Sequence, residues 1–405
     1  MKILSRLIFI AKYLLSKKII FKTPSPKDIV VFDDESFHEI KNIFENRNYF
    51  LFATRKENLK KIYLTKEILI EMIKNFNGRI YLSYLISIIK VVNPKIVVTF
   101  IHNSLHFSDV ARRLHKEISF IAVQNSSFID PSRFKFLKKK RLINEDPSKK
   151  YFLPLFFCFG DYEKDYLNKN KIKVLEYKKL GSLRLSNFFE YCKKSKKILK
   201  KNKYDICVMP EVLSEHDVFG GKTVSDGLIN IIKFSIKYAK KYKCKIVFPL
   251  KRDKKKQIDS FEYVNQAYKS QLSKSEYYFF INNCIKKKFF SHTSYFAVFQ
   301  SKLVIGSSST MLKEKLGYGG KVLGCNFTLG KLHEFPVKGI CNLSGKYNNN
   351  FLAFEKRVNK ILNMNINNYF KKIEKPKEYI LNFDKKFSTK QKIILEMNKI
   401  IENAK

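Results

Sequence analysis

The chain has 405 residues, of which 45% are hydrophobic and 29% charged, and its formal net charge is +44 at pH 7. This hydrophobic content excludes an intrinsically disordered chain, and the length is enough for two α/β domains of ordinary size. The charge does not by itself indicate a nucleic-acid-binding protein, because lysine is scattered through every segment and no RNA-binding or zinc-finger motif accompanies it. We expect an anionic partner, such as a nucleotide, a membrane surface or an acidic glycan, and no specific nucleic acid.

The seven cysteines are isolated, with no Cys-x-x-Cys pair and no Cys/His cluster at the spacing of metal ligands. An odd and unpatterned set argues for a reducing compartment and against a disulfide framework, which predicts a cytoplasmic protein. No Asp-x-Asp pair follows a predicted strand. We therefore expect no metal and no cofactor, with phosphate charge balanced by helix N-termini, hydroxyl groups and basic side chains.

Residues 1–22 have the pattern of a basic amphipathic helix. Its apolar positions are Leu4, Leu7, Ile8, Ala11, Leu14 and Leu15, with lysines and an arginine around them. The apolar run before Lys12 is too short to span a bilayer, and no small-residue cleavage site follows. Such a helix either lies on the anionic inner face of the cytoplasmic membrane, which would make the protein peripheral, or packs on its own domain.

Short apolar segments alternate with helical patterns through the first half of the chain. The predicted strands are 28–32, 49–53, 95–101, 118–123 and 155–159. The predicted helices begin near residue 37 and cover 65–92 and 108–115. This alternation is typical of βαβ units and a parallel sheet, so we predict a Rossmann-like domain over 23–192.

A second series of strands and helices follows a lysine-rich linker at 193–203. The predicted strands are 204–209, 245–250 and the two that flank a helix within 301–326, and a longer helix is predicted over 224–241. This pattern indicates a second Rossmann-like domain over 204–350, and 351–405 reads as a helical tail that can fold back. The predicted fold class is α/β, with two Rossmann-like domains that face each other across a cleft.

Polar side chains follow two strands of the first half. His102 and Asn103 come after 95–101, with Asp109 close behind, while Gln124 and Asn125 follow 118–123. Ligands of open parallel sheets bind beyond the carboxyl ends of the strands, so this pair of strand ends predicts an acceptor or sugar site. His102 and Asp109 are the candidate general bases, although turn and helix-cap chemistry would also favour such residues here.

The second half carries a strand, a hydroxyl-rich turn and a helix within 301–326. Leu303–Ile305 is a buried-strand pattern, and Ser307, Ser308, Ser309 and Thr310 precede a helix that contains Glu314. A helix start with clustered hydroxyl groups is suited to phosphate or carboxylate, although an ordinary capped helix has the same pattern. Lys251 and Arg252 follow the strand 245–250, where a cationic pair is well placed for a diphosphate.

The segment 302–326 resembles the donor-site motif of polysaccharide-building GT-B enzymes, including CDP-glycerol glycerophosphotransferases and Kdo transferases. Together with Asn93–Ser104 and Phe120–Asn125, its order is similar to that of bacterial surface carbohydrate biosynthesis proteins. The resemblance implies a GT-B-like fold with the donor in the C-terminal half and the acceptor in the N-terminal half. It covers most of the chain, through short motifs.

The resemblance also implies roles for individual residues. The hydroxyl groups of Ser307–Thr310 would hold the donor phosphate, Glu314 would contact the donor sugar or ribose, and Gln124 and Asn125 would line the cleft. The chain departs from the pattern at Ser126, where relatives have glycine, and at His102, where an acidic base would be more natural.

These observations predict a glycosyltransferase-like enzyme that moves a sugar or polyol phosphate from a nucleotide-activated donor to a glycan or lipid-linked glycan acceptor. Two alternatives stay open at this stage. A non-hydrolysing sugar-nucleotide epimerase would share the architecture, and a non-catalytic protein that binds RNA or glycan would use the positive charge.

Overall fold

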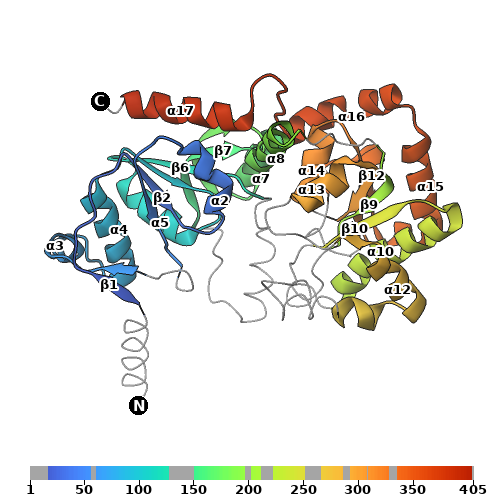
Figure 1. The fold of residues 1–405 in the computed structure, drawn as a ribbon, viewed down its shortest axis with the longest axis horizontal. Helices are drawn as coiled ribbons and strands as arrows, with labels where there is room; N and C mark the ends of the chain where they lie inside the picture. Colours follow the sequence, from blue (N-terminus) through green and yellow to red (C-terminus); the bar gives the residue numbers. More distant parts are fainter. Residues whose placement is uncertain are drawn as a thin grey trace, which may run out of the picture.

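The computed structural model describes residues 17–55, 61–126, 150–196, 202–210, 222–250, 266–285, 292–307, 309–327 and 335–403. These residues form two lobes, each built on a six-stranded sheet, and a small two-stranded sheet at the edge of the first lobe. Figure 1 shows the first lobe in blue to green and the second in yellow to orange. The predicted α/β class with two Rossmann-like halves is confirmed.

The first sheet is entirely parallel and has the strand order β3-β2-β5-β6-β7-β8. Its strands are β2 (Ile29–Phe32), β3 (Tyr49–Phe52), β5 (Ile96–Thr99), β6 (Ser119–Val123), β7 (Phe152–Cys158) and β8 (Lys173–Lys179). The strand order reverses between β2 and β5, because β3 lies on one side of β2 and the later strands of this sheet lie on the other. The carboxyl ends of β2 and β5 therefore border the crevice in which such sheets bind ligands.

Helices cover both faces of the first sheet. They are α2 (Phe37–Ile40), α3 (Lys66–Lys74), α4 (Ile80–Val92), α5 (Leu105–Leu114), α7 (Asp161–Lys169) and α8 (Leu183–Lys194). Val30 and Phe32 pack with α4 and α5 on one face, while Ile29 and Val31 share the other face with a helix from the end of the chain. This alternation is the two-residue period of a strand buried on both sides.

The second sheet is also parallel, in the order β11-β10-β9-β12-β13-β14. Its strands are β9 (Tyr204–Val208), β10 (Ile246–Pro249), β11 (Cys284–Ile285), β12 (Ser301–Gly306), β13 (Lys321–Asn326) and β14 (Asn342–Ser344). The chain starts at β9, builds outward to β11 and then crosses to β12. The switch crevice of this sheet therefore lies between the carboxyl ends of β9 and β12.

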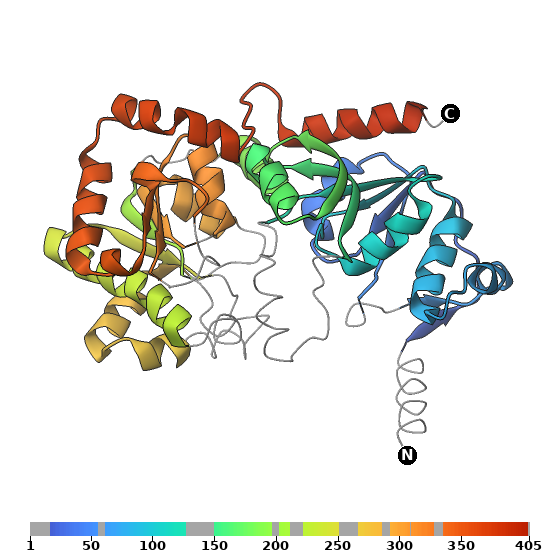
Figure 2. The same cartoon turned by 180° about the vertical axis from the view of Figure 1, so that it is seen from behind.

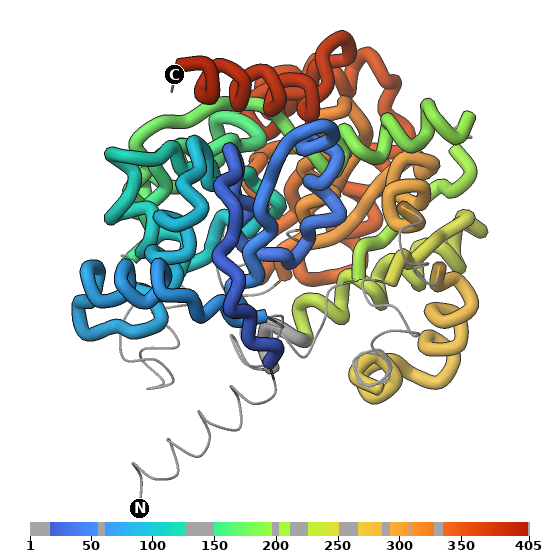
Figure 3. The backbone as a smooth tube through the Cα atoms, turned by 60° about the vertical axis from the view of Figure 1, so that its left-hand side comes forward, coloured from blue at the N-terminus to red at the C-terminus, as the bar shows by residue number. Residues whose placement is uncertain are grey.

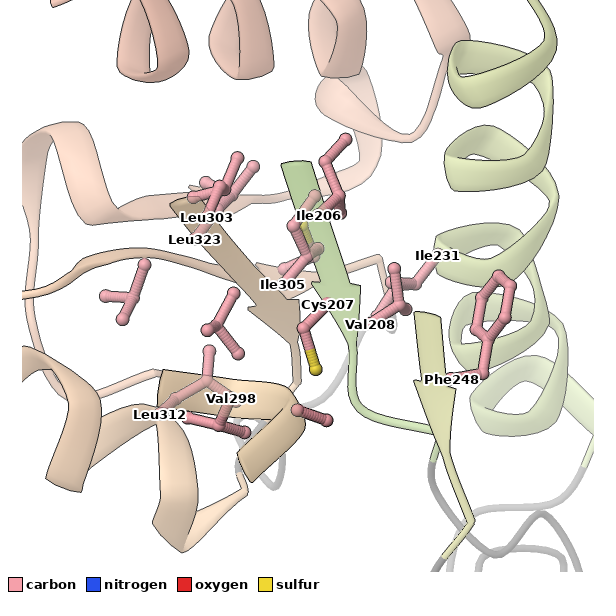
Figure 4. Close-up of a cluster of buried hydrophobic side chains, with 14 of the residues drawn as sticks. Ile206, Cys207, Val208, Ile231, Phe248, Val298, Leu303, Ile305, Leu312 and Leu323 are labelled. Atoms are coloured by element: carbon pink, nitrogen blue, oxygen red, sulfur yellow. The ribbon is translucent and has the colours of Figure 1, made fainter. Parts of the chain in front are cut away.

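The core of the second lobe joins these central strands to the helices around them. Figure 4 shows Ile206, Val208 and Ile305 of the sheet beside Leu312 and Ile231. The surrounding helices are α10 (Lys222–Tyr242), α12 (Lys274–Asn282), α13 (Thr293–Phe299) and α14 (Thr310–Gly317). Leu185 and Phe188 of α8 also belong to this core, so α8 packs into the second lobe although it follows the first sheet.

The C-terminal tail returns to the first lobe, as the sequence suggested. It consists of α15 (Phe351–Asn363), α16 (Ile366–Ile380) and α17 (Thr389–Asn403). Figures 1, 2 and 3 show α17 lying along the first lobe, where Ile393 and Met397 join the core beneath the first sheet. Between α16 and α17, the backbone N–H of Asn382 donates to Phe159 O at 2.8 Å.

The structure differs from the predicted elements in several places. The long helical region 65–92 is two helices, because the chain turns at Gly78 with φ of +81°. Lys18–Ile20 forms β1, which pairs with β4 (Lys61–Tyr63), so the predicted helix over 1–22 does not extend to residue 22, and residues 1–16 lie outside the described part. Within the described residues, no helix combines the length and hydrophobicity needed to span a bilayer.

The tail approaches the first lobe closely enough to exclude a side chain at Gly181. A Cβ there would lie 2.4 Å from Asn382 O, and the backbone has φ of +91°. We expect Gly181→Ala to lower the free energy of unfolding by about 2–3 kcal/mol, through backbone strain together with displacement of the tail. Chemical denaturation of the full chain measures this change.

Gly345→Ala is the matched control. Gly345 has a similar φ of +99°, but no atom lies within 4 Å of the position a Cβ would take. Its cost should be the backbone strain alone, about 1–2 kcal/mol. Equal losses in the two variants would show that contact with the tail contributes nothing at Gly181.

Candidate functional site

Three of the predicted site residues, His102, Gln124 and Glu314, lie where the two lobes meet. β5 and β6 are parallel neighbours in the first sheet, as expected. His102 and Gln124 therefore follow the carboxyl ends of two adjacent strands. Gln124 is joined to α14 of the second lobe through Glu163 of α7. The junction therefore combines strand-end residues of the first lobe with the helix of the hydroxyl-rich motif.

His102 is fully buried behind the end of β5. Its Nδ1 accepts the backbone N–H of Asn125 at 3.5 Å, and its ring lies against Phe156. Burial lowers the pKa of His102 to about 3, and the positive charges of Arg184 and Lys313 act in the same direction. The imidazole is therefore neutral, and a pKa so far below 7 suits a positioning role better than proton abstraction.

Gln124 holds a buried ion pair that crosses between the lobes. Its Oε1 accepts from the backbone N–H of Phe159 at 2.7 Å, and its Nε2 donates to Glu163 Oε1 at 2.8 Å. The same Glu163 oxygen accepts from Lys313 Nζ at 2.9 Å, and the two charged side chains are only 3% and 5% exposed. The Lys313 ammonium also lies 4.4 Å from the centre of the Tyr162 ring.

Glu314, the next residue of α14, makes a second bridge. Its carboxylate accepts from Ser182 Oγ at 2.5 Å, and it accepts from the Tyr295 hydroxyl at 2.9 and 3.0 Å. Ser182 is the N-cap of α8 and lies between Leu180 and Leu183, which belong to the core of the first lobe, so this bond joins α14 to the first lobe. Burial raises the pKa of Glu314 to about 7, although the Ser182 and Tyr295 hydrogen bonds and Arg184 lower it. The predicted contact between Glu314 and a donor sugar stays a prediction.

Asp109 lies on α5, within an arginine pair. Its carboxylate accepts from Arg79 at 2.7 Å, and Arg112 lies 3.6 Å away. This pairing connects the start of α4 to α5. The two arginines balance the negative charge of Asp109, so its position has a structural explanation that needs no substrate. The role of catalytic base therefore stays a prediction for both Asp109 and His102.

The hydroxyl-rich turn has the predicted form of strand, turn and helix. Ser307 is buried directly after β12, and Ser309 is the N-cap residue of α14, with Thr310 as the first helical residue. The Ser309 side chain makes no capping hydrogen bond to the helix. Ser308, Lys251 and Arg252 lie outside the described residues.

Arg184 and Glu39 are junction residues that the sequence analysis missed. Arg184 Nε lies 3.4 Å from Glu39 Oε1, and its guanidinium lies 5.5 Å from the ring centre of Phe100, beyond the end of β5. Burial opposes ionisation of Glu39, but His38 and Arg184 outweigh it and lower the pKa. No sequence signal marked this pair, because the edge strand β8 that precedes α8 has no apolar run.

An acidic turn after β2 was also missed. Asp33 is buried with φ of +81°, accepts from Arg55 Nε at 2.8 Å and lies at the switch crevice of the first sheet. Glu35 contacts the same arginine. Asn103 and Asn125 are half-buried at the neighbouring strand ends. In the described part of the chain, no three His, Cys, Asp or Glu side chains are placed to hold a metal ion.

Comparison with known proteins supports the architecture. A scan against protein families finds no match, and no curated protein is similar in sequence. Among solved structures, the chain is similar to a UDP-GlcNAc 2-epimerase from Methanocaldococcus jannaschii in complex with UDP-GlcNAc and UDP. That likeness has a TM-score of 0.51 at 13% identity and covers 92% of this chain and 99% of that one.

Two further structures are similar over nearly their whole length. The UDP-GlcNAc 2-epimerase of Neisseria meningitidis bound to UDP-GlcNAc gives a TM-score of 0.48 at 13% identity, with coverage of 92% of this chain and 99% of that one. A glycosyltransferase from Rickettsia africae gives 0.44 at 12% identity, with coverage of 96% and 98%. The two facing Rossmann-like lobes with a returning tail have the GT-B fold.

The ion pair between Lys313 and Glu163 gives a test of the junction. We expect Lys313→Met to lower the free energy of unfolding by about 3–5 kcal/mol, because it leaves the Glu163 charge buried without its partner. The double variant Lys313→Met with Glu163→Gln should lose less than the sum of the single losses, as measured by urea denaturation.

Lys302→Met is the control for this cycle. Lys302 pairs with Asp205 at 2.7 Å at the surface, where the lysine side chain is 47% exposed, so its loss should cost less than about 1 kcal/mol. If the losses of unfolding free energy at Lys313 and Glu163 are additive, the two side chains do not interact and the proposed ion pair is contradicted.

The raised pKa of Glu314 predicts a dependence of stability on pH. Its value is about 7 in the folded chain against an ordinary 4.5, so the folded state holds a proton that the unfolded state has lost between these values. The contribution of this group to stability is therefore present below about pH 4.5 and lost as the pH rises through about 7. Glu314→Gln stays neutral, so its stability relative to wild type should rise between about pH 5 and about pH 8.

Urea denaturation at several pH values measures this difference. Glu176→Gln, at an exposed position on β8, is the control and should track wild type across the range. A constant difference between Glu314→Gln and wild type would mean that Glu314 is already ionised in the folded state.

Proposed function

We propose that the chain is a GT-B-type glycosyltransferase of surface polysaccharide biosynthesis. It transfers a sugar or polyol phosphate from a nucleotide-activated donor to a glycan or lipid-linked glycan acceptor, without a metal ion. The second lobe binds the donor, and the first lobe binds the acceptor.

The observation that carries this proposal is the position of the turn before α14. β12 borders the switch crevice of the second sheet, and Ser307, Ser309 and Thr310 stand at its carboxyl end. The start of a helix offers backbone N–H groups and a partial positive charge to a phosphate. Because the Ser309 hydroxyl does not cap its own helix, it can donate to such a phosphate.

One similar structure supports a nucleotide sugar as the occupant. The epimerase structure from Methanocaldococcus jannaschii is a complex with UDP-GlcNAc and UDP, and the chain covers 99% of it. A sugar linked to a nucleoside diphosphate carries the negative charge that the start of α14 and a strongly basic chain would attract. Lys251 and Arg252, which follow the strand β10 in sequence, would assist with the diphosphate.

The first lobe would receive the acceptor at the carboxyl ends of β5 and β6. Asn103 and Asn125 are half-buried there and provide amide groups for sugar hydroxyls. Asp109 would serve as the base, His102 would position the backbone of Asn125, and Gln124 would position Glu163 at the junction. We infer a cytoplasmic site of action, with residues 1–22 on the inner face of the membrane.

Nucleotide-dependent stabilisation tests the donor site. The melting temperature of the full chain should be measured with UDP, CDP, CMP and GDP. It should rise with one of these nucleotide classes. A ligand at a hundredfold its dissociation constant stabilises by about 2.7 kcal/mol. Ser309→Ala should weaken binding of that nucleotide about tenfold, because a hydrogen bond to a charged phosphate is lost.

Ser273→Ala is the matched control, since Ser273 caps α12 within a capping box. That variant should lose about 1 kcal/mol of stability and keep its nucleotide affinity. If no nucleotide stabilises the chain and it binds RNA with steep salt dependence, the proposal fails. If the chain epimerises a sugar nucleotide in the absence of an acceptor, it is an epimerase rather than a transferase.

A further inference from the structure

A stripe of large apolar side chains faces solvent on α3 and the turn that follows it. Ile73 is 78% exposed and Phe76 is 59% exposed, and Ile80 at the start of α4 is 68% exposed. The backbone N–H of Phe76 donates to Ile73 O, and Ser83 of α4 donates to Asn75 O, so these side chains lie in one region. Leu69 and Ile70 extend the stripe along α3.

The fold of the lobe does not use this stripe. Ile68 is fully buried, and Met72 packs against the core of the first lobe, so α3 already has an inward face. Leu69 and Ile73 are four residues apart, which places them on a neighbouring face of the helix, and Phe76 follows in the turn after α3. Contiguous exposed apolar surface of this kind marks an interaction site.

The strand β1 adds to the same surface. Its Ile20 O accepts from Leu64 N, and Thr23 Oγ1 donates to Glu67 of α3 at 2.8 Å, so the chain between them runs beside the start of α3. Phe21 lies in this stretch and is 76% exposed. Figures 1 and 2 show β1, α3 and α4 together at the end of the first lobe that is farthest from the second.

Basic residues surround the apolar side chains. The segments 17–22 and 61–80 carry the lysines and arginine Lys17, Lys18, Lys22, Lys61, Lys66, Lys74 and Arg79. The acidic residues among them are Glu67 and Glu71, and Arg79 pairs with Asp109 of α5, so lysines make up most of the positive charge. An apolar centre with a cationic rim is the composition that binds the interface of an anionic bilayer, where apolar groups enter the acyl boundary and lysines meet the headgroups.

We propose that the face formed by β1, α3 and the start of α4 docks on an anionic lipid bilayer. The apolar side chains of Ile73, Phe76, Ile80 and Phe21 enter the headgroup region, and the lysines remain beside the phosphates. A second copy of the chain is a poorer occupant, because it would bring the same cationic rim against this one. The inference does not rest on nucleotide-sugar chemistry.

The docking face also continues the basic amphipathic segment that begins the sequence. Residues 1–16 join β1 directly, and their apolar positions Leu4, Leu7, Ile8, Leu14 and Leu15 alternate with lysines and Arg6. Two adjacent membrane contacts bind more tightly than either alone, since the second association is intramolecular. The bilayer would then lie at the end of the first lobe.

Sedimentation of the full chain with vesicles tests the proposal. Wild type should bind vesicles that contain phosphatidylglycerol more tightly than pure phosphatidylcholine vesicles. Ile73→Ser with Phe76→Ser should weaken the partition about tenfold or more, since two large apolar groups no longer enter the interface. Lys18→Glu with Lys66→Glu should reduce binding to the anionic vesicles specifically.

The matched control is Tyr347→Ser with Leu352→Ser in the second lobe, where the side chains are 93% and 73% exposed. This variant should partition like wild type. All variants should keep the thermal unfolding and the nucleotide response of wild type, which separates this test from that of the proposed function.

A spectroscopic readout is available because the chain has no tryptophan. Phe76→Trp should show a blue shift of emission when phosphatidylglycerol vesicles are added, and Tyr347→Trp should not. The proposal is overturned if wild type binds no vesicles, or if the Ile73/Phe76 variant binds as well as wild type. Self-association that the same substitutions abolish, without vesicle binding, would also overturn it.

Discussion

The buried ion pair between Lys313 and Glu163 connects the two lobes and sets the position of the residues around it. Both charges are removed from solvent, and such a pair is tolerated only where geometry and further hydrogen bonds compensate for lost hydration. Gln124 supplies that compensation by donating to Glu163 and accepting from the backbone of Phe159. The end of β6, the start of α7 and the middle of α14 are therefore held as one polar unit.

The tail adds further bonds to the same junction. Asn382 bonds to the backbone of Phe159 and of Lys179, and Tyr379 of α16 donates to Asp165 of α7 at 2.9 Å. This close approach requires glycine at position 160, because a Cβ there would lie 2.7 Å from Tyr379 O. The segment 159–165 is thus contacted by both α14 and the tail, and the second lobe reaches the first through two independent sets of bonds.

The sequence predicts the parts of this arrangement that depend on local pattern. The order of strand, turn, helix and strand over 301–326 is confirmed, because buried β-branched runs and a helix start with hydroxyl groups are strong local signals. The strand β8 was missed because it is a partly exposed edge strand with three lysines and a glutamate, so it lacks an apolar run. Glu163 and Lys313 were missed for a different reason. Charged residues in helices are usually solvated, and their burial arises from contact between positions 150 residues apart.

Helix α14 has two roles that its short length brings together. Its first residue lies at the switch crevice, and its fourth and fifth residues are Lys313 and Glu314, which bond to the first lobe. A rigid helical segment of two turns transmits a shift of its start to both bridges, because one turn rises only about 5 Å. An anion bound at the Ser309 end would therefore act on the same element that fixes the lobes relative to each other. Substitutions in α14 are therefore expected to affect both the proposed donor site and the bonds between the lobes.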